Sequence, residues 1–277
     1  MSVARMRVCV VVGSWAMAWG TMAAGQTTGT GTQQAGPRAK AKESVTVTAK
    51  LTPEELAQGE LEEAYQPVYQ WKKPADCAKI LELCETKIIP KAEATKFEGP
   101  KGKFLFLANR EIAGCAVRTG DYAKAEAHYQ KSLEYVAVWP GKDDTAYPQI
   151  YTGLGAAYLG QGREEDAVGA LEKAIAIEDE RIQEAANSDS EFRRTELSMH
   201  MRTGRLQAER LLAVARFKEG KQAEAMEILE KAYASAIENH VPAEDYRVVV
   251  ETGIEAAKFM GDSAAQEKWE ARSTAKN

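Results

Sequence analysis

Apolar and small residues recur every three or four positions along most of the chain after residue 50. The stretch "GDYAKAEAHYQKSLEY", Gly120 to Tyr135, shows the scheme: a turn glycine, an aromatic residue, and then small and bulky residues at helical spacing. Such spacing places the apolar side chains on one face of an α-helix. No stretch alternates apolar and polar residues between hairpin signals, as strands would. The pattern therefore predicts an all-α protein of about ten helices.

The first of these helices has a defined start, and short turns separate it from those that follow. Thr52 suits an N-cap, Pro53 the first helical position and Glu55 the third, which together form a capping box. Downstream, segments such as "EGPKGK", "TGD", "GQGRE", "EGK" and "MGD" are typical of turns between helices.

Four glycines divide the helical region into similar units. Gly120, Gly162, Gly220 and Gly261 each follow one helix and precede the next, where a left-handed backbone is expected. Around the first three, small or apolar residues recur at fixed offsets: Ala113, Gly155 and Ala213 before them, then Ala125, Ala167 and Ala225, Tyr129, Leu171 and Leu229, and Ser132, Ala174 and Ala232 after them. Small side chains let two antiparallel helices approach closely, and such hairpins must stack to bury their apolar faces.

The clearest copy of this unit is "YTGLGAAYLGQGREEDAVGALEKAIAI". Leu154, Gly155, Tyr158, Gly162, Ala167, Leu171 and Ala174 stand at the signature positions of the tetratricopeptide repeat (TPR) family, which the sequence resembles over about residues 104 to 275. Ala116 and Arg216 replace the usual tyrosine in two other copies, and the last copy, "FMGDSAAQEKW", is shifted by one residue. The resemblance implies an α-solenoid of antiparallel helix pairs.

The spacing of the units is irregular. Successive anchor glycines lie 42, 58 and 41 residues apart, whereas the family repeats about every 34. The first excess falls in "WPGKDDTAY", and the second falls between Ile175 and Leu206, where the sequence stays helical on both sides of "NSDS". We therefore expect two lengthened helices that project as an antiparallel pair beyond the repeats.

The N-terminal fifty residues differ from the rest. Residues 1–25, with Arg5 and Arg7 before an uncharged apolar run, are typical of a cleaved signal peptide. An uncleaved membrane anchor is the alternative, although a spanning helix needs about 20 mostly apolar residues. Residues 26–50 are rich in Gly, Thr, Gln and Lys and read as a disordered linker. An N-terminal helical hairpin at 51–103 and TPR-like repeats at 104–277 follow, in a periplasmic or secreted bacterial protein.

Charge narrows the range of partners. The chain is 44% hydrophobic and 28% charged, which is ordinary for a soluble protein. Without Arg5 and Arg7, 34 basic residues stand against 41 acidic ones, so cleavage would change the net charge from −5 to −7. Nucleic-acid binding is not expected, because it needs a positive surface that displaces counterions. After leader cleavage no further apolar run would embed the protein in a membrane.

The TPR resemblance implies a partner-binding groove lined by the first helix of each hairpin. The family positions correspond to Arg110, Arg118, Gln149, Thr152, Leu159, Gln207, Arg210, Phe217 and Lys218. The four cations among them would suit an acidic or carboxylate-bearing peptide. Ordinary solvated charge is the alternative.

A second group of arginines, Arg193, Arg194, Arg202 and Arg205, follows "NSDS". Ion pairing with Glu180, Glu184 or Glu196 is the favoured interpretation, and a docking face for another protein is the alternative.

Three cysteines lie beyond the leader. Cys77 and Cys84 would be about 10 Å apart along one helix, too far for a mutual disulfide. Cys115 could pair with either Cys77 or Cys84 in an oxidising compartment, and free buried thiols are the alternative.

No catalytic constellation is apparent. His128, His200 and His240 have no ligand spacing, and the sequence has no phosphate loop, zinc signature or nucleophile elbow. We therefore predict no cofactor, no metal site and no enzymatic activity. The function expected is that of an exported TPR scaffold that binds a protein or peptide. The alternatives are a structural subunit of a stable envelope assembly and a helical enzyme with an unrecognised site.

Overall fold

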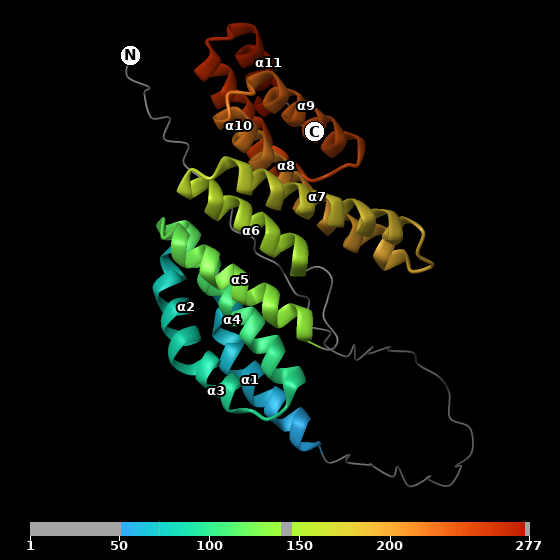
Figure 1. Ribbon diagram of the computed structural model, residues 1–277. Helices are drawn as coiled ribbons and strands as arrows, with labels where there is room; N and C mark the ends of the chain where they lie inside the picture. Colours follow the sequence, from blue (N-terminus) through green and yellow to red (C-terminus); the bar gives the residue numbers. More distant parts are fainter. Residues whose placement is uncertain (1–50, 72, 140–145, 275–277) are drawn as a thin grey trace, which may run out of the picture.

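The computed structural model describes residues 51–71, 73–139 and 146–274, and all regular structure in these ranges is helical (Figure 1). The all-α prediction is confirmed for this part of the chain. The expected leader (1–25) and linker (26–50) lie outside the described residues. Among the described helices, none combines the length and apolar character needed to cross a bilayer.

Within the described ranges, five helical hairpins stack in sequence order (Figure 1). The first joins α1 (Pro53–Gln70) to a helix built from α2 (Cys77–Leu83), the π-turn η2 (Cys84–Ile88) and α3 (Ile89–Ala94), after a single 3-10 turn, η1 (Pro74–Asp76). The others pair α4 (Glu98–Thr119) with α5 (Tyr122–Val138), α6 (Ala146–Gln161) with α7 (Glu164–Ala186), α8 (Ser198–Lys218) with α9 (Gln222–Glu238), and α10 (Ala243–Met260) with α11 (Ser263–Thr274); a π-turn, η3 (Arg193–Leu197), leads into α8. The predicted architecture of antiparallel helix pairs is therefore confirmed.

Two local predictions have different outcomes. The capping box is present: the Glu55 amide donates to the Thr52 hydroxyl (3.2 Å) and the Thr52 amide to the Glu55 carboxylate (2.6 Å). The turn expected at "EGPKGK" is wrong, because these residues form the first turns of α4. Pro100 lies in the first turn, where an amide has no helical partner to lose. As a result, α4 runs across the boundary expected at residue 103.

All four anchor glycines adopt the predicted left-handed conformation. Gly120, Gly162, Gly220 and Gly261 have φ between 70° and 83°. The amide of the residue after each donates to a carbonyl five positions earlier, for example Asp121 to Ala116 at 2.9 Å, which is the Schellman closure of a helix. His240 closes α9 in the same way with φ 54°, without the freedom of glycine.

The small residues lie where the two helices of a hairpin meet. Ala125, Ala167 and Ala225 are at most 1% exposed. A Cβ added to Gly155 of α6 would lie 2.5 Å from Cγ of Leu171 on α7, so only glycine allows this approach. Gly153 of α6 similarly faces the ring of Tyr129 on the preceding α5, at 2.2 Å from an added Cβ. These contacts set the spacing of the stack.

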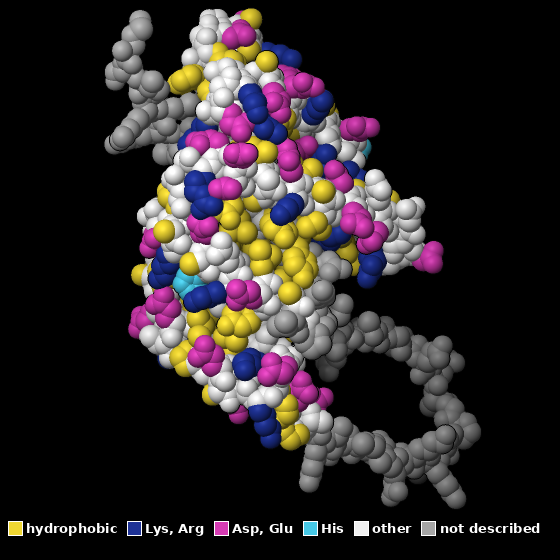
Figure 2. Space-filling view, in the orientation of Figure 1, with side chains coloured by type: hydrophobic (Ala, Val, Ile, Leu, Met, Phe, Trp, Pro, Cys, Tyr) yellow, Lys and Arg dark blue, Asp and Glu magenta, His cyan; other side chains and the backbone are white. Residues whose placement is uncertain are grey.

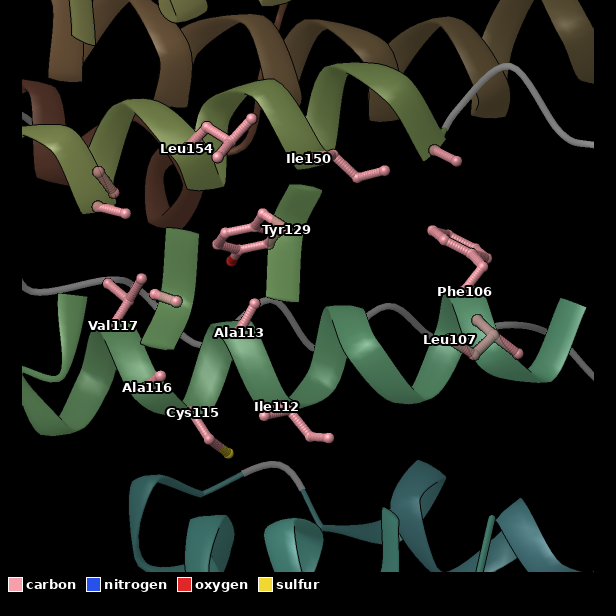
Figure 3. Close-up of a cluster of buried hydrophobic side chains, with 14 of the residues drawn as sticks. Phe106, Leu107, Ile112, Ala113, Cys115, Ala116, Val117, Tyr129, Ile150 and Leu154 are labelled. Atoms are coloured by element: carbon pink, nitrogen blue, oxygen red, sulfur yellow. The ribbon is translucent and has the colours of Figure 1, made fainter. Parts of the chain in front are cut away.

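The buried side chains form two clusters that meet at α8. One cluster runs from α1 through α7 to Ala208 and Leu211 of α8, and the other joins Leu206 and Ala213 of α8 to α9, α10 and α11. In the first, Ala113 of α4 points toward Tyr129 and α6, whereas Ile112 and Cys115 point the opposite way (Figure 3). Helix α4 therefore packs against both the hairpin before it and the hairpin after it.

The lengthened pair is also confirmed. The ends of α7 and the start of η3–α8 extend past the other hairpins (Figure 1). Arg181 and Glu178 of α7 form an ion pair at 3.0 Å, and both side chains are at most 9% exposed. At the tip, the Phe192 side chain is 64% exposed, which is unusual for a large aromatic residue.

Candidate functional site

The first helices of successive hairpins contact one another and form one continuous face. We call the face of α4, α6, α8 and α10 the first-helix face. Arg110 of α4 donates to Oε1 of Gln149 on α6 (3.3 Å), and Lys218 of α8 donates to the carbonyl of Leu159 on α6 (3.3 Å). The structure thus brings together four of the predicted groove residues, from three different helices.

Not every predicted residue on this face is accessible. Leu159, Gln207 and Arg210 are 2%, 8% and 5% exposed, because neighbouring first helices pack over them. Arg210 donates through Nε to Gln207 (3.3 Å), and burial lowers its pKa to about 10 against the opposing effect of Glu251 and Glu255. These three positions line contacts between helices rather than a surface open to a partner.

The remaining predicted residues are half-buried or exposed. They are Arg110, Arg118, Gln149, Thr152, Phe217 and Lys218. Arg110 also pairs with Glu111 at 2.8 Å, and Lys218 lies 3.8 Å from Glu164. Near the C-terminal end of the face, the ring of Phe217 meets that of Phe259, which is 54% exposed, at a centroid distance of 5.3 Å.

Arg118 points away from the face on which the sequence placed it. Its Nε donates to Sγ of Cys77 on α2 (3.1 Å) and its Nη2 to Sγ of Cys115 (3.0 Å). Cys77, Cys84 and Cys115 are buried free thiols, and burial raises the pKa of Cys115 to about 12. The guanidinium is therefore a partner of the thiols rather than a lining residue.

The middle helix of the face carries no charge. Residues 146–162 contain no Asp, Glu, Lys or Arg, although 28% of the whole chain is charged. Hydrophobic side chains gather near the centre of the molecule over α6, while charged ones spread across the helices on either side (Figure 2). Tyr151 of α6 is half-buried, with Nζ of Lys173 5.7 Å from its ring.

The structure also contains a pocket that sequence reasoning missed. It has a volume of about 340 Å³ and lies among α7, α8 and α9. Arg205 of α8 pairs with Asp179 of α7 (2.5 Å) and with Glu209 (2.6 Å), rather than with the glutamates that the sequence favoured. Burial raises the pKa of Glu209 to about 6, against the lowering effect of Arg205.

Acidic, basic and aliphatic side chains together line this pocket. Its lining residues include neither histidine nor cysteine. Across the part of the chain that the structure describes, no three His, Cys, Asp or Glu side chains are grouped to hold a metal ion. Arg202, Arg205, Leu206 and Glu209 follow at i, i+3, i+4 and i+7, so one face of a helix could have been anticipated, but its cover by α7 and α9 could not.

The stacked hairpins define an α-solenoid, and comparison with known proteins agrees. Residues 104–179 match the sequence model of the tetratricopeptide repeat family. This segment of the chain therefore carries tetratricopeptide repeats.

A solved structure supports the same fold. A single-substitution variant of the putative kinesin light chain TPR-like repeats from Podosopora anserina is 18% identical, with a TM-score of 0.50 over 79% of this chain and 92% of that one. The form without the substitution gives 18% identity and a TM-score of 0.49 over the same shares. At this identity the likeness concerns the fold alone. No curated protein matches the chain.

Proposed function

We propose that this protein is an exported bacterial scaffold that binds a protein or peptide partner on its first-helix face. TPR arrays generally act through protein–protein contacts, and their stacked repeats create extended binding surfaces. Such scaffolds are typically non-catalytic.

The proposal rests on hydrogen bonds that join three first helices. Because Arg110 contacts Gln149 and Lys218 contacts the Leu159 carbonyl, α4, α6 and α8 present one surface instead of three separate ridges. An extended peptide could cross it and meet half-buried polar groups in turn. The uncharged α6 would supply the central contact.

A preference for an acidic partner rests on two cations. Arg118 is held by thiols and Arg210 is buried, so Arg110 and Lys218 remain available among the four predicted cations. Lys218 is exposed and lies 3.8 Å from Glu164, which leaves its ammonium able to meet a carboxylate from outside.

A photo-crosslinking amino acid placed at Lys218, and separately at Lys131, tests the surface. Both lysines are exposed, but Lys131 lies on α5, a second helix. Partners from an envelope extract should crosslink at residue 218 and not at residue 131, and Lys218→Glu should weaken capture more than Lys131→Glu. Equal crosslinking at both positions would refute the first-helix face as the binding surface.

Export is part of the same proposal and has a separate test. The leader signature at residues 1–25 supports it. Periplasmic fractionation followed by N-terminal sequencing should give a chain that starts near residue 26. A full-length chain in the cytoplasmic fraction would contradict export, and one in the membrane fraction would favour the anchor.

A structural subunit of a stable envelope assembly is the second candidate. Its support is Phe192, 64% exposed at the tip of the projecting pair, where an interface could cover it. If so, Phe192→Ser should release the protein from the assembly while Lys218→Glu should not.

A further inference from the structure

Side chains from three helices, α7, α8 and α9, line the pocket. The lining residues are Arg202, Arg205, Leu206 and Glu209 from α8, Asp179 and Ile182 from α7, Lys231, Ser235 and Ala236 from α9, and Val241, which follows α9. The pocket shares α8 with the first-helix face but none of the residues Arg110, Gln149, Leu159 and Lys218 that join that face, so it can be tested independently of the proposed function.

One acceptor on a lining residue of the pocket is unused. Glu209 is 8% exposed, and its Oε1 accepts from Arg205 at 2.6 Å. Its Oε2 is buried and has no hydrogen-bond partner among the described residues. A buried carboxylate oxygen without a donor is costly, and a cationic donor would satisfy it.

One donor in the pocket is unused as well. Arg202 is half-buried and makes no hydrogen bond or ion pair with any residue that the structure describes. By contrast, Arg205 is engaged by two carboxylates, and Lys231 pairs with Glu227 on its own helix at 2.6 Å. Arg202 is therefore the group able to receive an anion from a ligand.

The pocket that holds Glu209 and Arg202 is partly apolar. Ile182, Leu206, Ala236 and Val241 supply aliphatic surface. About 340 Å³ is the size of a small-molecule site. Asp179, Glu209 and Arg205 together carry a net charge of −1, and Arg202 brings the total to zero. A ligand that carries one positive and one negative charge, and is therefore neutral overall, fits these groups best.

We propose that this pocket binds a small aliphatic zwitterion, an α-amino acid or a dipeptide, with its ammonium on Glu209 and its carboxylate on Arg202. The aliphatic side chain packs against Leu206 and Ile182. Ammonium binding keeps Glu209 ionised, so affinity increases as the pH rises through 6, the pKa of Glu209 in the free protein.

Three matched probes test the two charges separately in the folded protein. They are leucine, 3-methylbutylamine, which lacks the carboxylate, and 4-methylpentanoate, which lacks the ammonium. Amide chemical shifts of α8 and α9, followed at millimolar concentrations, should saturate with leucine. Each half-molecule should bind about tenfold more weakly, because one charged hydrogen bond is lost.

Substitutions should reproduce this division. Glu209→Gln should weaken the binding of leucine and 3-methylbutylamine about tenfold but not that of 4-methylpentanoate. Arg202→Gln should weaken the binding of leucine and 4-methylpentanoate about tenfold but not that of 3-methylbutylamine. Glu180→Gln and Arg193→Gln, at exposed positions outside the pocket, should change nothing.

Two results would overturn the proposal, and neither requires a variant to fold. One is the absence of saturable shifts with leucine in the unaltered protein. The other is equal binding of leucine and 3-methylbutylamine, which would assign the pocket to a lysine or arginine side chain of a protein partner.

Discussion

The indole ring of Trp269 on α11 lies against Gly253 on α10, where an added Cβ would come within 2.4 Å of Cδ2. Trp269 is fully buried, and Tyr233 meets its ring at a centroid distance of 5.9 Å. This contact is equivalent to that of Gly155 with Leu171, but Gly253 stands one residue farther from its anchor glycine than Gly155 does, and Trp269 stands one residue closer to it than Leu171 does. The shifted last copy is therefore a complete hairpin.

Gly253→Ala should destabilise the protein by about 1–3 kcal/mol, because a methyl group would overlap the buried indole. The control is Gly169→Ala on α7, where an added Cβ meets nothing within 4 Å. There the change should stabilise the protein by up to about 1 kcal/mol through helix propensity. Urea denaturation measures both; equal effects would mean that the Trp269 contact is not tight.

Substitutions at two left-handed turn positions should change the stability of the protein in opposite directions. Gly220→Ala should cost about 1–2 kcal/mol, because φ of 83° strains a residue with a Cβ. His240→Gly should gain up to about 1 kcal/mol, because φ of 54° already strains histidine. Thermal unfolding of the two variants should show shifts in opposite directions, and a loss of stability in His240→Gly would contradict the argument.

Glu209→Gln should stabilise the protein above pH 6 and have little effect below pH 4.5. The carboxyl has a pKa of about 6 when folded against 4.5 for an unperturbed glutamate, so the native state holds the proton more tightly and stability falls as the pH rises between these values. Arg202 and Arg205 on α8, Asp179 on α7 and Lys231 on α9 face this group.

The expected gain above pH 6 is on the order of 2 kcal/mol. Chemical denaturation of both proteins across this range checks the sign. A gain that is the same at every pH would mean that ionisation of Glu209 is not its source.

Oxidation should join Cys115 to Cys77 and not to Cys84. The two sulfurs of the expected pair accept hydrogen bonds from the same guanidinium, Arg118, at 3.1 and 3.0 Å. With oxidised glutathione as oxidant, the two thiols lose two protons and two electrons to the glutathione disulfide. Peptide mapping should find this bridge in the unaltered protein and in Cys84→Ser; a bridge that contains Cys84 would contradict it.

Much of the fold could be predicted because its determinants are local. The capping box at Thr52, the left-handed glycines and the long α7–α8 pair each follow from residues a few positions apart. The orientation of Arg118 could not be predicted, because it depends on Cys77, 41 residues earlier, across a helix contact. Likewise, Glu209 stands in an ordinary helical sequence, and only α7 and α9 remove it from water.

The position of α8 between the two buried clusters has a consequence for cooperativity. Leu206 and Ala213 face the C-terminal cluster, while Ala208 and Leu211 face the N-terminal one. Either half of the array can unfold from its own end while the other half stays folded. Unfolding of α8, however, would expose the buried clusters of both halves. Amide hydrogen exchange would therefore be slowest in α8. Partly unfolded forms would lose either the hairpins before α8 or those after it, while α8 itself stays folded.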